Sequence, residues 1–187
     1  MADLQLTHAP ILNSSAQLLI LPVNTAGILL DPVLARTKTL FPDNYQSYYR
    51  ACRDGTLSVG SCLLHKRVLE QTGLGAGPSG NQPSYIANLI ISDHPYHPAR
   101  TRWLNAALAD LQEQLLPLIR YQGIRRAALL ARPLMFENPR EDTNATIRSE
   151  NLIPLDWHTD TLPLLTQHLQ SLPKLCIDIH LPKDIII

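Results

Sequence analysis

One stretch near the N-terminus, residues 16–42, constrains the fold more than any other part of the sequence. It reads AQLLILPVNTAGILLDPVLARTKTLFP: an apolar run, a turn that contains Gly27, and a helix-like segment. The run over residues 18–23 shows no polar–apolar alternation, which is typical of a strand buried on both faces. Asp31 followed by Pro32 is a favourable helix start, with Asp as the N-cap and Pro at the first helical position. A strand that leads through a turn into a helix N-terminus is the usual place where an α/β protein holds a phosphate.

The rest of the sequence alternates between strand-like and helix-like segments. Apolar or β-prone runs predict strands at residues 4–7, 60–68, 85–91, 126–131 and 175–181. Capping residues and helical spacing predict helices over residues 32–40, 42–54, 103–119 and 160–168, the last with Asp160 as its N-cap. This alternation predicts an α/β fold, a three-layer α-β-α domain with a mixed central sheet that spans residues 1–187 as one domain. Residues 72–83 are expected to form a flexible connection, and residues from about 132 to 155 an insertion loop.

Composition excludes several classes of protein. The formal net charge is zero, so no global electrostatic attraction indicates a nucleic acid or an anionic membrane as partner. The three cysteines, Cys52, Cys62 and Cys176, form no CxxC pair, which argues against a cysteine zinc site and a disulfide framework. The sequence has no signal-peptide pattern and no apolar span of about 18 residues, so we expect a cytoplasmic protein without a membrane segment.

The order of several short motifs resembles the macro domain. They are PVNTAG at residues 22–27, FP at 41–42, a tyrosine-bearing helix, DG at 54–55, YIANL at 85–89 and LDW at 155–157. More narrowly, the pattern is similar to the branch that contains bacterial DNA ADP-ribosyl glycohydrolase antitoxins, and it runs from about Leu4 to Gln170. The resemblance implies an ADP-ribose cleft at the C-terminal ends of the strands. Two glycine-rich loops would hold the diphosphate, an early Gly-Asp the adenine, and a lysine after the YI-x-N-F strand would act at the ribose.

On this resemblance, the ligand lies against the first turn and the loops that follow the later strands. The expected ligand-binding residues are Asn24, Thr25, Gly27, Asp31, Ser92 and Arg132. Asn24 has two interpretations that the sequence leaves open: a contact to the distal ribose, or an amide that ties the turn to a neighbouring strand. Arg132 also has two, an anion clamp formed with Arg100 and Arg102, or a solvated side chain.

The chain departs from the family pattern at the positions that bind ligand. Ala9-Pro10 replaces the Gly-Asp, so no carboxylate is available for the adenine amino group. In the first phosphate loop only Gly27 remains, Leu30 adds a side chain, and Pro32 lacks an N–H donor. Asp31 places an anion at the helix N-terminus, and its repulsion of a phosphate costs on the order of 1–4 kcal/mol. Ser92 stands near the position of the lysine and cannot replace an amine.

The loop after the strand at residues 85–91 carries the candidates for catalysis. Asp93 and His94 are the expected catalytic residues if the chain is an enzyme, as general acid or base. His94 and His97 form a His-x-x-His pair, but the neighbouring prolines make a stiff surface turn, and we expect no metal site.

Two functions follow from these observations. The favoured hypothesis is a divergent macro-domain protein without standard ADP-ribosyl hydrolase activity, a binding or interaction module for a nucleotide-type ligand or a protein partner. The alternative is an active ADP-ribosyl glycohydrolase-like enzyme, on DNA or protein, that uses non-standard cleft residues such as Asp93, His94 or Arg132. Neither hypothesis calls for a cofactor.

Overall fold

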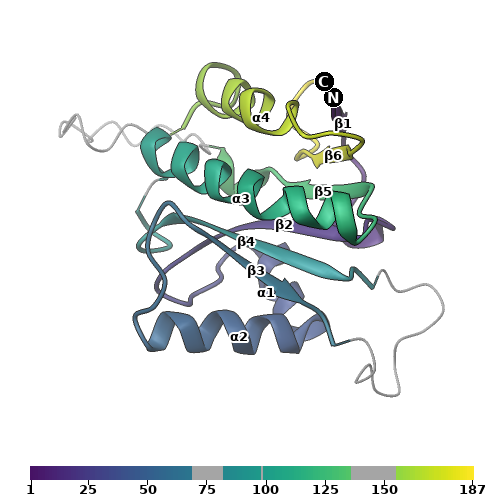
Figure 1. Ribbon diagram of the computed structural model, residues 1–187. Helices are drawn as coiled ribbons and strands as arrows, with labels where there is room; N and C mark the ends of the chain where they lie inside the picture. The colour runs from purple at the N-terminus through teal and green to yellow at the C-terminus, as the bar shows by residue number, and fades with distance from the viewer. Residues whose placement is uncertain (69–81, 98, 136–154) are drawn as a thin grey trace, which may run out of the picture.

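A computed structural model describes residues 1–68, 82–97, 99–135 and 155–187, and in these residues one sheet carries helices on both faces (Figure 1). The strands are β1 (Asp3–Thr7), β2 (Leu18–Asn24), β3 (Cys62–Lys66), β4 (Tyr85–Ser92), β5 (Arg126–Leu130) and β6 (Cys176–His180). The helices are α1 (Pro32–Leu40), α2 (Pro42–Arg53), α3 (Thr101–Tyr121) and α4 (Leu162–Leu169). Most of the predicted connection at residues 72–83 and of the insertion at 132–155 lies outside the described residues.

The sheet has the strand order β1-β6-β5-β2-β4-β3, and every neighbouring pair is parallel except β3 with β4. This confirms the predicted three-layer fold with a mixed sheet. Every residue of β2 and β4 is buried, because these strands lie in the middle of the sheet with helices above and below. Their burial on both faces explains why the sequence of β2 shows no alternation.

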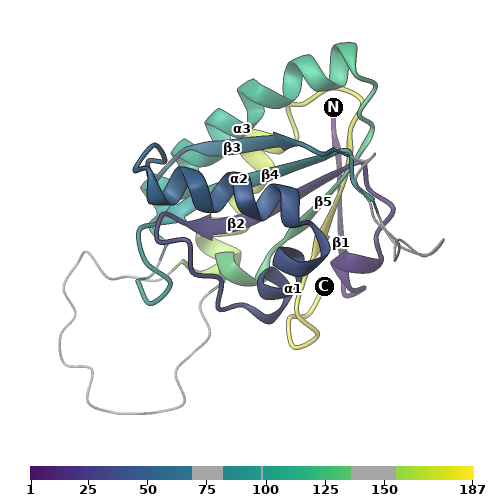
Figure 2. The same ribbon diagram turned by 90° about the horizontal axis from the view of Figure 1, so that it is seen from below.

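Helices α3 and α4 cover one face of the sheet, and α1 and α2 cover the other (Figures 1 and 2). The first face packs on the apolar side of α3, where Leu104, Leu108, Leu111 and Leu115 are fully buried. On the second face, Tyr48 of α2 and Leu34 of α1 pack on the buried residues of β2 and β4 that point toward these helices. This arrangement places the N-terminus of α1 beside the carboxyl end of β2, where the sequence predicted a ligand.

The start of the last helix differs from the prediction. Asp156, and not Asp160, is the N-cap: its carboxylate accepts a hydrogen bond from the Thr159 N–H at 2.8 Å. A π-helical turn, Trp157–Thr161, precedes α4. The Asp160 carboxylate accepts instead from the main-chain N–H of Asp156 at 3.0 Å, so the two acids close the same turn from opposite ends.

An ion pair with a buried arginine holds the start of α2 against the end of β3 and the residue that follows it. The Asp43 carboxylate accepts from Arg67 Nη2 at 2.9 Å and lies 3.0 Å from His65 Nε2. The Arg67 side chain is 3% exposed and stacks on the Phe41 ring. Partial burial would raise the pKa of Asp43, but the hydrogen bonds from Arg67, His65 and the Val68 N–H outweigh it and hold that pKa well below its usual range.

We therefore expect Asp43→Asn to lower the free energy of unfolding by about 2–4 kcal/mol at pH 7, since it leaves the Arg67 guanidinium buried without a counter-charge. The folded pKa of Asp43 lies below the unfolded value of about 3.9, so its contribution is fully present above about pH 5 and is lost as the pH falls through the folded pKa. In urea unfolding measured from pH 7 to pH 2, the difference in the free energy of unfolding between wild type and variant should become smaller as the pH falls.

Asp54→Asn is the control for this prediction, because Asp54 belongs to an exposed pair with Arg53 at the end of the same helix. It should change stability by less than about 0.5 kcal/mol. An Asp43 variant as stable as this control, or a gap that widens in acid, would contradict the assignment.

Candidate functional site

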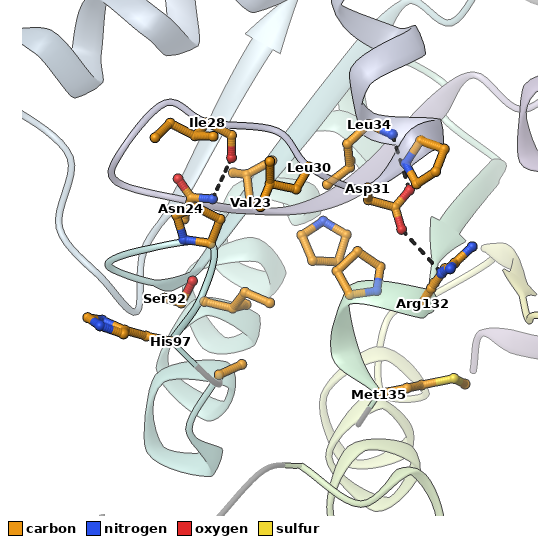
Figure 3. A pocket seen from close by; sticks show the side chains of 16 residues that line it. Val23, Asn24, Ile28, Leu30, Asp31, Leu34, Ser92, His97, Arg132 and Met135 are labelled. Carbon is orange, nitrogen blue, oxygen red and sulfur yellow. Dashed lines mark hydrogen bonds and ion pairs between the residues drawn. The ribbon is translucent and has the colours of Figure 1, made fainter. Parts of the chain in front are cut away.

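The carboxyl ends of β2, β4 and β5 border a cavity of about 380 Å³, which we call the inner cavity (Figure 3). Three segments line it: the turn after β2, the loop after β4 and the short helical turn that follows β5. Their main contributions are Asn24, Ile28, Leu30, Asp31, Ser92, His97, Arg132 and Met135. Crossover connections bring these segments to one edge of the sheet, the usual position of a ligand in an open α/β fold.

The Asn24 side chain closes the turn after β2. Its Nδ2 donates to the Ile28 carbonyl at 2.8 Å, and its Oδ1 accepts from the Ala26 N–H at 3.0 Å (Figure 3). The residue is 6% exposed, and its main-chain carbonyl accepts from the Tyr48 hydroxyl at 2.5 Å. The amide is therefore committed to the turn itself, rather than to a neighbouring strand.

Gly27 is required by the backbone of this turn. Its φ is +76°, and an added Cβ would lie 3.3 Å from the Tyr49 ring. The residue lies against α2 and not on the wall of the inner cavity. Thr25 is also outside the wall, and its hydroxyl donates to the Asp93 carbonyl at 3.3 Å.

Asp31 fills the N-terminus of α1, as the sequence predicted. Its Oδ1 accepts from the N–H groups of Val33 at 2.8 Å and Leu34 at 3.3 Å. Its Oδ2 lies 3.6 Å from Arg132 Nε, and its side chain is only 12% exposed (Figure 3). The Asp31–Arg132 pair therefore joins the turn after β2 to the turn after β5, with a carboxylate at the positive end of the helix.

The main chain after β5 offers few donors to a ligand. The N–H groups of Ala131, Leu134 and Met135 donate to carbonyls of His180, Ala131 and Arg132 at 3.1, 2.8 and 3.1 Å. Pro133 has no N–H. In the turn after β2 the N–H groups of residues 28–31 donate to no described residue, so they remain available beside the Asp31 carboxylate.

The loop after β4 contributes a second polar group. Ser92 lines the inner cavity, and its hydroxyl donates to the His94 carbonyl at 3.2 Å. Asp93 Oδ1 lies 2.9 Å from His97 Nδ1, and this hydrogen bond is the main cause of the lowered pKa of Asp93. His97 lines the cavity, whereas His94 does not, and the two rings are tilted at 42° with their centroids 5.0 Å apart. Of these three residues, only His97 borders the inner cavity.

A second, larger cavity lies on the other side of the Asp31–Arg132 pair. This outer cavity has a volume of about 720 Å³ and is bordered by residues 8–13, the start of α1 and the segment after β6. Pro32 and Arg132 line both cavities, so the pair stands between them. Of the predicted site residues only Arg132 lines the outer cavity, and Ala9 and Pro10, which stand in place of the family's Gly-Asp, also lie on its wall.

Within the described ranges, no cluster of three or more His, Cys, Asp or Glu side chains is arranged to hold a metal ion. In the same ranges no helix has the length and hydropathy that a membrane span needs.

Comparison with known proteins gives relatives of one kind. Over 131 residues, 70% of this chain, the sequence is 30% identical to a DNA ADP-ribosyl glycohydrolase of Thermus aquaticus. The match takes in 32% of that protein, so the chain spans about a third of the length of this curated relative. No protein-family model matches the sequence.

Solved structures agree with this relationship. The macrodomain of Thermus aquaticus DarG superposes with a TM-score of 0.72 at 24% identity, over 97% of this chain and 100% of that one. Thermosipho africanus DarTG in complex with ADP-ribose superposes with a TM-score of 0.66 at 21% identity, over 99% and 43% of the two chains. The resemblance predicted from the order of the motifs is confirmed by these matches.

The hydrogen bond from Tyr48 to Asn24 gives a prediction about the first turn. Burial raises the pKa of Tyr48 well above its usual value, so its hydroxyl stays protonated and can donate. Tyr48→Phe should lower the free energy of unfolding by about 1–2 kcal/mol, because a buried carbonyl loses its donor. Tyr49→Phe is the control, since Tyr49 lies on the same helix and is 48% exposed. Equal effects of the two changes in urea unfolding would contradict this role for Tyr48.

Proposed function

We propose that this chain, which has the macrodomain fold and resembles the DNA ADP-ribosyl glycohydrolase branch, is a divergent binding module without the standard hydrolase chemistry. Its ligand is a nucleotide-type molecule, and a segment of a protein partner is the other occupant that the cleft admits. Two relatives suggest the class of ligand: a DNA ADP-ribosyl glycohydrolase and a DarTG complex that contains ADP-ribose.

The Asp31–Arg132 pair is the observation that carries the proposal. A diphosphate at the N-terminus of α1 would meet the Asp31 carboxylate, which already accepts from two of the N–H groups there. In the turn after β5, three N–H groups already donate to carbonyls of the chain. An anion bound to the N–H groups of residues 28–31 would lie beside the Asp31 carboxylate, and the repulsion between the two charges costs on the order of 1–4 kcal/mol.

The position expected for the catalytic lysine supports the loss of chemistry. Ser92 ends β4 on the wall of the inner cavity, and its hydroxyl is bound to the His94 carbonyl at 3.2 Å. No lysine lines the inner cavity in the described part of the chain. The outer cavity, in contrast, is open and more than large enough for one nucleobase.

Calorimetric titration with ADP-ribose tests the proposal. Wild type should bind with a dissociation constant weaker than about 100 μM. Asp31→Asn should bind at least about tenfold more tightly, because the amide oxygen still caps α1 while the charge is gone. The Thermus aquaticus macrodomain serves as the positive control for release of ADP-ribose from modified DNA, a release that this chain should not catalyse.

Asp54→Asn is the matched control for the charge change, because Asp54 ends α2 and does not line the inner or the outer cavity. Its ADP-ribose affinity should equal that of wild type. Low-micromolar binding by wild type, unaltered in Asp31→Asn, would overturn the proposal.

The Asp93–His97 pair favours a second candidate function, a glycohydrolase-like enzyme. A carboxylate on Nδ1 fixes the imidazole tautomer and leaves Nε2 to act as general base, and His97 lines the inner cavity. If wild type does release ADP-ribose from modified DNA, His97→Gln should reduce the rate by about 100-fold or more. His94→Gln should change it little, because His94 does not line the cavity. Turnover that survives both changes, and Asp93→Ala as well, would remove this candidate.

A further inference from the structure

One edge of the sheet has main-chain hydrogen-bonding groups that no described residue uses. β1 is the first strand in the order β1-β6-β5-β2-β4-β3, at the top of the row of strands in Figure 1. The Thr7 carbonyl accepts from the Leu181 N–H at 2.8 Å, so every second residue of β1, counted from Asp3, directs its main-chain groups toward β6. The N–H and carbonyl groups of Leu4 and Leu6 therefore point away from the sheet, and none of them is bonded within the described residues.

The other edge strand, β3, is protected against pairing. The Asp110 carboxylate accepts from the Cys62 N–H at 2.8 Å, and Gln114 Nε2 donates to the Cys62 carbonyl at 2.8 Å, so side chains of α3 occupy the start of that edge. Farther along β3, Lys66 is exposed, and an exposed lysine is a common protection of an edge strand. The outward-directed residues of β1 are leucines, so β1 is the edge at which a further strand can join the sheet.

The side chains of β1 specify the kind of strand that fits beside it. Leu4 and Leu6 are half-buried and pack on the core that α3 and α4 cover. Asp3, Gln5 and Thr7 point to the opposite face, where Gln5 Nε2 donates to the Asp3 carboxylate at 2.9 Å. An added strand must continue this alternation, with apolar side chains toward α4 and polar ones on the other face. β1 itself has this pattern, and it is also the open edge that a second copy of the chain offers.

We propose that the chain forms a twofold homodimer in which β1 pairs antiparallel with β1 of a second copy. An axis through Gln5, normal to the sheet, keeps the apolar faces of the two copies on the same side. Leu4 then lies opposite Leu6 of the second copy, and the open main-chain groups of the two copies form four N–H···O bonds. The two Gln5 side chains meet at the axis and Asp3 faces Thr7 of the second copy, so no like charges oppose each other.

Sedimentation velocity of the 187-residue chain, from about 5 μM to 1 mM, tests the inference. The dimer should have a dissociation constant on the order of 10–500 μM, because two short edge strands make a small interface. Leu6→Pro removes an outward-directed N–H and no bond of the β1–β6 ladder, and it should weaken association at least about tenfold. Leu64→Pro is the matched control on the β3 edge, where the N–H also points outward, and it should leave association unchanged.

Cysteine cross-linking locates the contact. Gln5→Cys places two thiols at the axis, in a non-hydrogen-bonded pair whose Cα atoms lie about 4.5 Å apart, within reach of a disulfide. Thr7→Cys is the control on the same face, because its two thiols would lie about 14 Å apart along the strands. Both variants carry Cys176→Ser, which removes the thiol of the neighbouring strand. Mild oxidation should cross-link the first variant and not the second.

A chain that stays monomeric at about 1 mM would overturn the inference and leave the edge to a strand of another protein. A dimer that survives Leu6→Pro, in a variant with unaltered far-UV circular dichroism, would place the contact elsewhere and overturn it too. A dimer that Gln5→Cys does not cross-link would have the same consequence. These results leave the proposed function standing, because that claim is decided by ADP-ribose and Asp31→Asn.

Discussion

The ability of the cleft to bind an anion depends on the position of one negative charge, the Asp31 carboxylate. The Asp31 carboxylate caps α1 through two N–H groups and lies 3.6 Å from Arg132 Nε, so it stabilises the helix start and places a negative charge there. A helix N-terminus attracts whichever anion reaches it, and a covalently attached carboxylate is present at very high effective concentration. A diphosphate from solution must therefore compete with a side chain that loses no translational entropy when it binds to the helix N-terminus.

The Asp31–Arg132 pair lies where the inner cavity meets the outer cavity, and the two cavities have different lining residues. The inner cavity has His97 and Ser92 on its wall, and the outer cavity has His180, Arg36 and Lys183. In the described residues both cavities share Pro32 and Arg132, so a change at Asp31 alters the surroundings of each.

The sequence predicted the layers of the fold well, because the strongest patterns are physical requirements of the central elements. The unbroken apolar run of β2, the Asp31-Pro32 helix start and the apolar face of α3 each have one favourable structure. Asp160 was assigned the cap that belongs to Asp156, because two acids four residues apart satisfy the same sequence pattern and only the hydrogen bonds distinguish them. The cleft was less predictable. The sequence places Asp31 and Arg132 about a hundred residues apart and gives no sign that they pair.

The most direct test of this account compares the affinities of wild type for ADP-ribose and for AMP under the same conditions. If the Asp31 carboxylate excludes the diphosphate, the added phosphate and ribose contribute nothing, and the two dissociation constants should agree within about threefold. ADP-ribose binding about a hundredfold more tightly than AMP would show that the N-terminus of α1 still holds a diphosphate, and would contradict the account.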